Sequence, residues 1–266
     1  MPNNDYIPVL SEVKEIVRHT ANEWTFRLSY DDALSVKPSQ FFEISIPKYG
    51  ESPISVSGIT PGLLDFTIRR VGHVTGEIFN YNVGDKIYIR GPYGNGFDLD
   101  QYRGKELVIV AGGTGVSPVR GVIEYFAEHM DETKGVHVIA GFRDLNAILF
   151  RADFAKWRKV MDITMTLDVG EPTEEYGIGL VTKYIPDLKI SAPASAEAII
   201  AGPPAMIRFA AKALAETGFP ETHMWVDESR RMCCGLGKCG HCRVNDTYIC
   251  KDGPVFNYAV GKQLQD

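Results

Sequence analysis

The sequence feature that most constrains this chain is a run of closely spaced cysteines near its carboxyl end. The stretch CCGLGKCGHC places four cysteines within residues 233–242, and Cys250 follows eight residues later. The rest of the 266 residues contain no cysteine. Residues 230–266 show little hydrophobic periodicity, so we expect a bound metal to organise them as a small domain.

The spacing within this run predicts which cysteines bind the metal. Cys234, Cys239, Cys242 and Cys250 read as C-x4-C-x2-C-x7-C. The first three match the plant-type spacing of [2Fe–2S] ligands, in which a fourth cysteine lies further along the chain. The interspersed glycines would let the loop wrap a cluster and turn backbone N–H groups toward its sulfurs. We therefore predict these four cysteines as metal ligands.

The cysteine spacing also allows other interpretations of the metal site. A structural zinc site favours two separated C-x2–4-C knuckles, whereas three of these cysteines lie in a single loop. A Rieske centre needs two histidines on one iron, and only His241 lies in the loop. Cys233 lies outside the predicted spacing, and a ligand set that uses it is the alternative register.

Charge and hydropathy argue against two classes of partner. The formal net charge of −6 and the sequence pI of about 5.6 argue against nucleic acid, whose phosphates need a basic surface. No run of 18 apolar residues occurs, so no membrane span is predicted. The start, MPNNDYIPVL, lacks the regions of a signal peptide. We therefore expect a cytoplasmic protein, in which clustered cysteines more often bind metal than form disulfides.

The rest of the chain shows two different patterns of hydrophobic residues. Residues 1–98 carry short runs of β-branched and aromatic residues at the spacing of a small antiparallel β-barrel. Residues 99–229 alternate apolar strand runs with helical patterns, which predicts a parallel α/β sheet. With the cysteine segment, this gives three predicted domains: 1–98, 99–229 and 230–266. The predicted strands are 23–30, 41–47, 63–71, 85–94, 106–111, 135–142, 162–169, 195–202 and 223–228, and the predicted helices are 117–130, 147–160 and 203–218.

Two glycine-containing turns join strands to helices in the α/β segment. VIVAGGTGVSP (108–118) is a buried strand followed by glycines and by Pro118 in the first helical turn, although the full G-x-G-x-x-G fingerprint is incomplete. AGPPAM (201–206) is a second such turn. Turns at the carboxyl ends of strands in one sheet form a crevice, and helix N-termini offer N–H groups to a pyrophosphate. The pair predicts a dinucleotide site.

A barrel, a dinucleotide domain and a carboxyl-terminal cluster loop together resemble the ferredoxin-NADP reductase superfamily. Within it, the chain looks most like three groups: electron-transfer subunits of dihydroorotate dehydrogenase, gamma subunits of hydrogenase and the corresponding subunit of anaerobic sulfite reductase. The motifs that carry the resemblance are GPYGNGF (91–97), the two glycine turns, GFR (141–143) and CGLGKCGHC…YICKDGPVF. The resemblance implies FAD in the barrel, NAD(P)H in the α/β domain and electron exit through the cluster.

The flavin residues follow from this resemblance. SPIS (52–55) takes the place of an R-P-x-S motif, with Ser52 where an arginine usually neutralises the FAD pyrophosphate. Arg69 and Arg70 are predicted to compensate, and the segment 69–75 is expected to meet the pyrophosphate. The implied flavin contacts are Pro53, Ile54, Ser55, Arg69, Arg70, His73, Val74 and Thr75.

The nicotinamide residues also follow from the resemblance. The implied contacts are Gly112, Gly113, Thr114 and Gly115 at the phosphates, Phe142 and Arg143 at the adenosine end, and Gly202, Pro203 and Pro204 beneath the nicotinamide. Many relatives have a cysteine where this chain has Ala201, so no catalytic thiol is predicted. Asp144 beside Arg143 would repel a 2′-phosphate, so NADH is predicted over NADPH.

The predicted function is electron transfer within a larger reductase. No separate catalytic residue is predicted, because the redox chemistry belongs to the cofactors. The ending CKDGPVFNY favours the sulfite reductase relative, so the predicted partners are an iron–sulfur subunit and a siroheme-containing catalytic subunit. The alternatives are electron-transfer subunits of dihydroorotate dehydrogenase or cytosolic hydrogenase and, in another class, a zinc-stabilised dinucleotide-sensing module.

Overall fold

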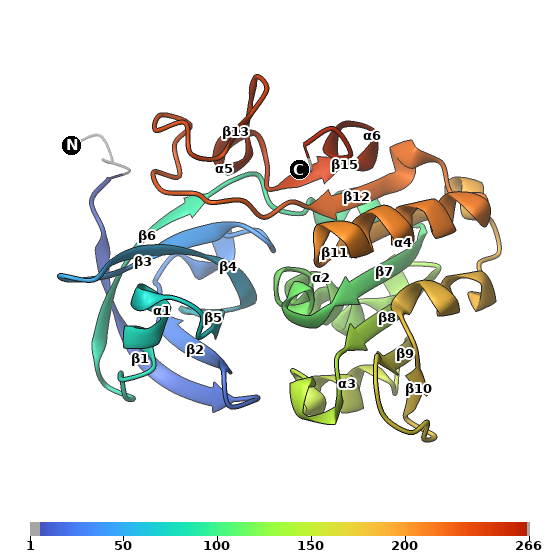
Figure 1. The fold of residues 1–266 in the computed structure, drawn as a ribbon, viewed down its shortest axis with the longest axis horizontal. Coiled ribbons are helices and arrows are strands. Elements are labelled where there is room, and N and C mark those ends of the chain that lie inside the picture. The colour runs from blue at the N-terminus through green and yellow to red at the C-terminus, as the bar shows by residue number, and fades with distance from the viewer. Residues whose placement is uncertain (1–5, 265–266) are drawn as a thin grey trace. The chain divides into compact units, whose positions relative to one another are not determined.

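The computed structural model describes residues 6–264 (Figure 1). Among them, two compact units form: residues 6–97 with 229–254, and residues 98–228 with 255–264. The predicted carboxyl-terminal segment, 230–266, is therefore divided between the two units. Its cysteine-bearing part packs with the amino-terminal residues, and its last part joins the α/β sheet.

The first unit is built on a closed antiparallel barrel, which confirms the predicted class. Around the barrel the strand order is β1-β2-β5-β4-β3-β6 (Figure 1). The strands are β1 (Val9–Arg18), β2 (Glu23–Ser29), β3 (Phe41–Ile46), β4 (Gly50–Thr60), β5 (Leu63–Arg69) and β6 (Lys86–Tyr93).

Two of these strands, β1 and β4, are absent from the predicted set. In β4 the pattern is interrupted by Pro53 and Gly58, residues that seldom occupy strand interiors. A register shift between Val56 and Gly58 accommodates this part of β4 against β5. The short helix α1 (His73–Ile78) follows β5.

Aromatic and aliphatic side chains from alternate strand positions fill the barrel. The ring of Phe42 contacts Tyr30 and Phe66 edge-on, with ring centroids 5.2 and 5.5 Å away. Phe42, Phe66 and their neighbour Phe26 are fully buried. Burial of each such side chain contributes about 1.5–3 kcal/mol, so the barrel has a core of its own.

The second unit is a seven-stranded sheet in the order β10-β9-β8-β7-β11-β12-β15 (Figure 1). All neighbouring strands are parallel except β12 and β15. The predicted parallel α/β class is thus confirmed. The strands are β7 (Glu106–Gly112), β8 (Gly135–Phe142), β9 (Asp162–Leu167), β10 (Tyr176–Ile178), β11 (Glu197–Ala201), β12 (Met224–Asp227) and β15 (Val255–Asn257). The helices are α2 (Val116–Glu128), α3 (Arg151–Trp157), α4 (Pro204–Glu216) and α6 (Tyr258–Gly261).

Two local predictions differ from the structure. The helix predicted over 147–160 is restricted to α3, because Asp144 caps a separate turn at Leu145–Ala147 and Phe150 adopts a left-handed conformation. Residues 255–264 are organised by the sheet rather than by a metal, since β15 pairs with β12. Among the described residues, no helix combines the length and apolar character needed to cross a membrane.

Candidate cofactor-binding sites

The two glycine turns lie at the carboxyl ends of adjacent strands. The strand β7 ends at Gly112, residues Gly113–Gly115 form a short turn, and α2 begins at Val116. The strand β11 ends at Ala201 and α4 begins at Pro204. Since β7 pairs with β8 on one side and β11 on the other, the strand order reverses here. Such a switch point is where open α/β sheets bind ligands.

The two turns are packed against each other. A Cβ atom at Gly115 would lie 2.4 Å from the carbonyl oxygen of Ala201, which is closer than real side chains approach backbone. At Gly112, a Cβ atom would lie 2.4 Å from the sulfur of Met206. Glycine at 115 is therefore required for the turns to meet, whereas a side chain at 112 would require the flexible Met206 side chain to move. By contrast, Gly113 has φ +55°, and no described atom lies within 4 Å of where its Cβ would stand.

The first turn of α2 contains a buried hydroxyl. The Oγ atom of Ser117 has no hydrogen-bond partner among the described residues, although Ser117 is almost fully buried. Pro118 stands beside it in the same helical turn, as predicted. A buried hydroxyl without a partner costs free energy, which a ligand that hydrogen-bonds to it would recover.

The predicted adenosine-end residues have very different environments. Phe142 is buried and contacts Phe154 edge-on at 6.1 Å, so its side chain belongs to the core. Arg143 is 79% exposed, and its Nε donates to the Asp144 carboxylate at 2.9 Å. That ion pair lowers the pKa of Asp144. A bound phosphate would have to compete with Asp144 for the guanidinium.

The predicted flavin strand is the first half of β4. Pro53, Ile54 and Ser55 are all half-buried and pair with β3. Nearby, the rings of Tyr49 and His73 contact each other at 5.0 Å, and Tyr49 is partly exposed. The chain therefore presents apolar and aromatic surface beside this strand, which suits a planar aromatic ligand.

The loop before α1 is held by one hydroxyl. The Oγ1 atom of Thr75 accepts the backbone N–H groups of Val71 and Gly72 at 3.2 and 2.9 Å. Arg69 pairs with Glu23 of β2 at 3.1 Å, and its side chain is 60% exposed. The Arg70 guanidinium lies over the Phe79 ring at 5.9 Å. Both arginines thus have partners within the barrel that a pyrophosphate would have to displace.

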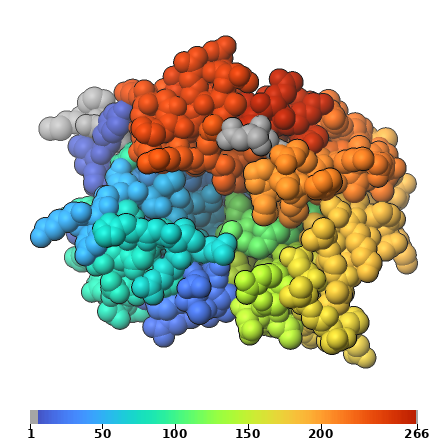
Figure 2. Space-filling model, viewed as in Figure 1, coloured from blue at the N-terminus to red at the C-terminus, as the bar shows by residue number. Residues whose placement is uncertain are grey.

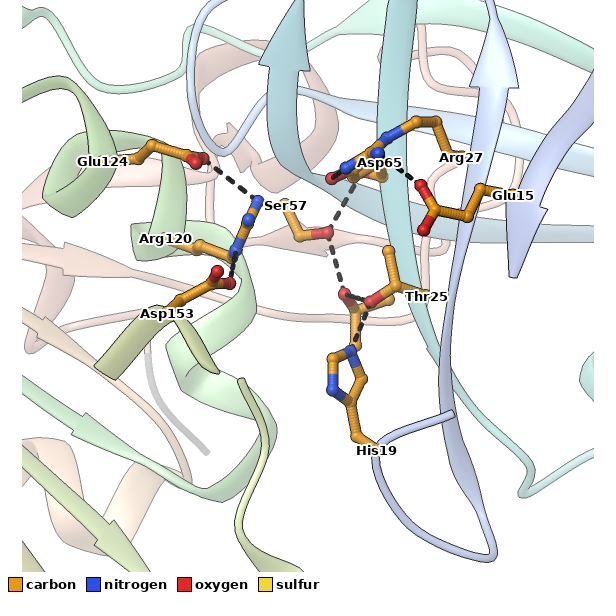
Figure 3. A network of polar contacts seen from close by, with 10 residues as sticks. Glu15, His19, Thr25, Arg27, Ser57, Asp65, Arg120, Glu124 and Asp153 are labelled. Atoms are coloured by element: carbon orange, nitrogen blue, oxygen red, sulfur yellow. Dashed lines mark hydrogen bonds and ion pairs between the residues drawn. The ribbon is translucent and has the colours of Figure 1, made fainter. Parts of the chain in front are cut away.

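A chain of hydroxyl groups crosses strands β2, β4 and β5 (Figure 3). It runs from His19 Nε2 to Thr25 Oγ1 at 2.7 Å, on to Thr67 Oγ1 at 2.7 Å, and then to Ser57 Oγ at 2.8 Å. Figure 3 also shows a pair in the second unit, where Arg120 of α2 binds Asp153 of α3 at 2.9 Å. These contacts fix the barrel strands to one another and, separately, α2 to α3.

The four predicted metal ligands form two pairs of thiols. The side chains of Cys234 and Cys239 interact, as do those of Cys242 and Cys250, and the Cys250 backbone N–H donates to the Cys242 sulfur at 3.5 Å. Cys239 is exposed, whereas Cys242 and Cys250 are buried. Much of the segment 229–254 lies at the surface (Figure 2). Among residues 6–264, no group of three or more Cys, His, Asp and Glu side chains is arranged around one metal ion. Pairs are what a [2Fe–2S] cluster uses, because each iron takes two thiolates.

Backbone N–H groups turn toward these sulfurs. Leu236 and Lys238 donate to the Cys234 sulfur, both at 3.4 Å, and Gly237 donates to the Cys250 sulfur at 3.2 Å. Burial disfavours the Cys234 thiolate, but the N–H donors outweigh it and lower the Cys234 pKa to about 6. Such donors are the outer contacts that iron–sulfur thiolates need, so the loop fits a cluster.

Two other cysteines, Cys233 and Cys250, have raised rather than lowered pKa values. Burial raises the pKa of Cys250 to about 12 and also raises the pKa of Cys233. The Cys233 thiol interacts with the side chain of Arg231. The N–H donors at Cys234 therefore favour the register that begins there, with Cys233 outside the ligand set.

Comparisons with known sequences agree with a nucleotide-binding region followed by a cluster-binding region. The family model of the oxidoreductase NAD-binding domain matches residues 109–212, and that of the iron–sulfur cluster binding domain of dihydroorotate dehydrogenase B matches residues 229–260. The gamma subunit of sulfhydrogenase 2 from Pyrococcus furiosus is 34% identical, covering 97% of this chain and 96% of the relative. A probable electron transfer subunit of dihydroorotate dehydrogenase B from the same organism is 32% identical, covering 95% and 90%.

The chain belongs to the family that contains these sulfhydrogenase gamma subunits and dihydroorotate dehydrogenase electron transfer subunits. Its fold is that of a chain in the NADH-dependent reduced ferredoxin-NADP oxidoreductase, with a TM-score of 0.78, 22% identity and coverage of 99% and 94%. A ferredoxin NADP+ reductase from Neisseria gonorrhoeae, solved with bound FAD and NADP, gives a TM-score of 0.68 at 18% identity, covering 79% and 92%. The two structures show the fold. The family models and the relatives make the chain an electron-transfer subunit of an oxidoreductase, with an NAD-binding domain and an iron–sulfur cluster binding domain.

Sequence reasoning missed the buried ionisable residues of the barrel unit. Glu43 on β3 is fully buried, and neither carboxylate oxygen has a hydrogen-bond partner among the described residues. Burial raises the pKa of Glu43 to about 8, although nearby Arg90 opposes the shift. The available signal was a charged residue inside each of two apolar strand patterns, FFEISI and KIYIRGPY.

Proposed function

We propose that this chain oxidises NADH on a barrel-bound FAD and delivers electrons through a [2Fe–2S] cluster to the catalytic subunit of a reductase, with sulfite as the terminal acceptor. FAD supplies the conversion of a two-electron hydride into single electrons, and the cluster supplies a one-electron exit. The chain itself binds and orients these groups. The paired thiols with their N–H donors are the observation that supports this role most directly.

The glycine turns are proposed to hold the nicotinamide cofactor. Gly112, Gly113, Thr114 and Gly115 would place backbone N–H groups at the pyrophosphate, where the start of α2 adds its positive dipole. The open space beside Gly113 and the unpartnered hydroxyl of Ser117 support a ligand here. Gly202, Pro203 and Pro204 would form the surface beneath the nicotinamide, because the second turn packs directly on the first.

The preferred cofactor is proposed to be NADH. Arg143 is the cation nearest in sequence to the predicted adenosine end, and Asp144 already binds it. A 2′-phosphate would meet the Asp144 carboxylate, whose lowered pKa keeps it ionised at neutral pH. Phe142 would contribute through its backbone, because its side chain is buried in the core.

The flavin is proposed to lie along β4. Pro53, Ile54 and Ser55 would border the isoalloxazine and ribityl chain. Backbone groups at His73, Val74 and Thr75 would meet the pyrophosphate, since Thr75 holds the preceding loop in place. Arg69 and Arg70 would supply the positive charge that Ser52 does not. Their present partners are an exposed ion pair and a ring face, both weak enough to exchange for a phosphate.

Three terminal partners compete within this proposal. The ending CKDGPVFNY favours a siroheme-containing sulfite reductase subunit together with a further iron–sulfur subunit. The likeness to a sulfhydrogenase gamma subunit over 97% of the chain favours a hydrogenase. The likeness to a dihydroorotate dehydrogenase subunit over 95% of the chain favours that enzyme.

Purification of the native complex without oxygen separates these partners. The chain should carry iron, sulfide and FAD, and NADH should bleach the flavin absorbance. A co-purifying subunit with a siroheme spectrum and NADH-dependent sulfite reduction would support the sulfite assignment. NADH-dependent hydrogen evolution would instead assign the chain to a hydrogenase, and dihydroorotate turnover would assign it to dihydroorotate dehydrogenase. Zinc in place of iron would overturn the electron-transfer role altogether.

A further inference from the structure

Arg90 is a buried side chain of the barrel unit with several hydrogen bonds. It lies on β6 and is 6% exposed. Its Nε and Nη2 donate to the Glu51 carboxylate at 2.8 and 2.6 Å. The other three N–H groups donate to the carbonyl oxygens of Cys233 and Cys234, both at 2.8 Å, and to the Tyr93 hydroxyl at 2.9 Å. All five guanidinium N–H groups therefore have acceptors.

Two of these bonds orient the backbone at the first proposed cluster ligand. In a trans peptide the C=O and N–H groups point in opposite directions. Because Arg90 draws the carbonyls of Cys233 and Cys234 toward itself, the N–H groups of Cys234 and Gly235 point away from it. The chain then continues into the turn whose N–H groups reach the Cys234 sulfur. Arg90 thus sets the direction in which the cluster loop begins.

The opposite end of the guanidinium reaches the proposed flavin strand. Glu51 lies on β4, two residues before Pro53. One side-chain pair therefore connects the strand proposed to border the flavin with the backbone of the first proposed iron ligand. The Tyr93 ring also packs against the loop, because a Cβ atom at Gly235 would lie 2.5 Å from it.

The charge at this point has a consequence for electron transfer. Net charge and hydrogen bonding around a [2Fe–2S] cluster set its reduction potential. Reduction adds one negative charge, so a nearby buried cation stabilises the reduced form. Arg90 is such a cation, and Glu51, which is 32% exposed, partly offsets it. The two side chains should shift the potential in opposite directions.

We propose that Arg90 is a positioning residue that fixes the cluster loop to the flavin strand and, with Glu51, sets the reduction potential of the cluster. This inference rests on the proposed function, because it requires a cluster at Cys234. A purely structural role would lower stability on substitution and leave the potential of the retained cluster unchanged.

Redox titration followed by electron paramagnetic resonance tests the inference on the full chain, purified without oxygen. Arg90→Met should favour the oxidised cluster at least tenfold, a fall of about 59 mV for one electron. Glu51→Gln should raise the potential, because the Arg90 charge then lacks its counter-ion. Arg90→Lys keeps the positive charge but not the five hydrogen bonds of the guanidinium. The cluster potential in this variant should therefore stay nearer the wild-type value, while amide hydrogen exchange over residues 233–238 becomes faster.

The matched control is Arg27→Met. Arg27 also forms a two-bond ion pair between barrel strands, with Asp65 at 2.7 and 3.0 Å (Figure 3). Its removal should leave the cluster potential and the exchange of residues 233–238 unchanged. Wild-type potentials in both Arg90→Met and Glu51→Gln would overturn the inference while leaving the proposed function intact. If Arg90→Met retains no cluster, an unchanged potential in Glu51→Gln alone overturns it. Wild-type protein without iron would overturn both.

Discussion

The two units bring their site residues together by different means. In the α/β unit, the glycine turns meet because β7 and β11 are neighbours in a parallel sheet, which places both carboxyl ends at one edge. In the barrel unit, the cysteine loop is tied to a strand 143 positions earlier, through Arg90 and Cys233. Local sequence patterns therefore suffice to predict a site where the sheet topology is regular. The position of a loop without regular structure depends instead on a buried charged residue from elsewhere in the chain.

The largest expected effect concerns the cysteines. Serine at 234, 239, 242 or 250 should abolish the cluster, because an alkoxide is a harder and poorer ligand for iron than a thiolate. Serine at 233 should leave iron and sulfide content unchanged. Flavin bleaching by NADH should persist in all five variants, since it precedes the cluster. If Cys233→Ser loses iron and Cys234→Ser keeps it, the register is wrong by one residue.

The buried carboxyl of the barrel should make stability depend on pH. The Glu43 pKa of about 8 lies above its ordinary 4.5, so the folded chain keeps a proton that the unfolded chain releases. Stability should therefore fall as pH rises from about 4.5 to about 8, by about 1.4 kcal/mol per unit and on the order of 5 kcal/mol in all. Thermal unfolding of Glu43→Gln across pH 5–8.5 should show a flatter profile than wild type. Parallel profiles would contradict the assignment to Glu43.

A glycine pair separates backbone strain from packing in the barrel unit. Gly235 and Gly62 both have φ +74°, but a Cβ atom at Gly235 would strike the Tyr93 ring, whereas Gly62 has no described atom within 4 Å. Alanine at Gly62 should cost about 1 kcal/mol from strain alone. Alanine at Gly235 should cost roughly 1–3 kcal/mol more and reduce iron content. Equal melting temperatures for the two variants would remove Tyr93 as a support of the loop.

The flavin arginines should show a smaller effect, because they are exposed. Replacing Arg69 and Arg70 together with alanine should weaken FAD binding by about 1 kcal/mol, or roughly fivefold in Kd. Arg18→Ala is a control, since Arg18 also lies over an aromatic ring, that of Trp24. Unchanged FAD affinity in the double variant would show that these arginines do not replace the charge missing at Ser52.

The smallest effect is expected at the adenosine end of the α/β unit. Asp144→Asn should free Arg143 and raise the NADPH-to-NADH ratio of kcat/KM, by roughly two- to fivefold because the pair is exposed. The wild type should prefer NADH with an artificial electron acceptor. A wild-type preference for NADPH would instead make Arg143 the ligand of the 2′-phosphate.

The regular parts of the fold were predictable from local patterns. The run GVHVIAGF coincides with β8, and the helix predicted over 203–218 contains α4, because burial on both faces of a strand and the 3.6-residue period of a helix are legible in sequence. The strand β4 was missed because Pro53 and Gly58 hide its pattern. The last strand, β15, was missed because a segment of three residues is too short to show the two-residue hydrophobic period of a strand. Only its pairing with β12 defines it.

The sequence alone determined the two classes of unit, the glycine turns and the spacing of the cysteines, since each depends on residues close together in the chain. Only the tertiary structure decided that the cysteine loop packs with the barrel, that Glu43 is buried, and that Arg90 binds Glu51 and two cysteine carbonyls. For Arg90 the physical reason is that a buried charge is tolerated only where its partners converge. That convergence joins strands and loops distant in sequence, and no local pattern records it.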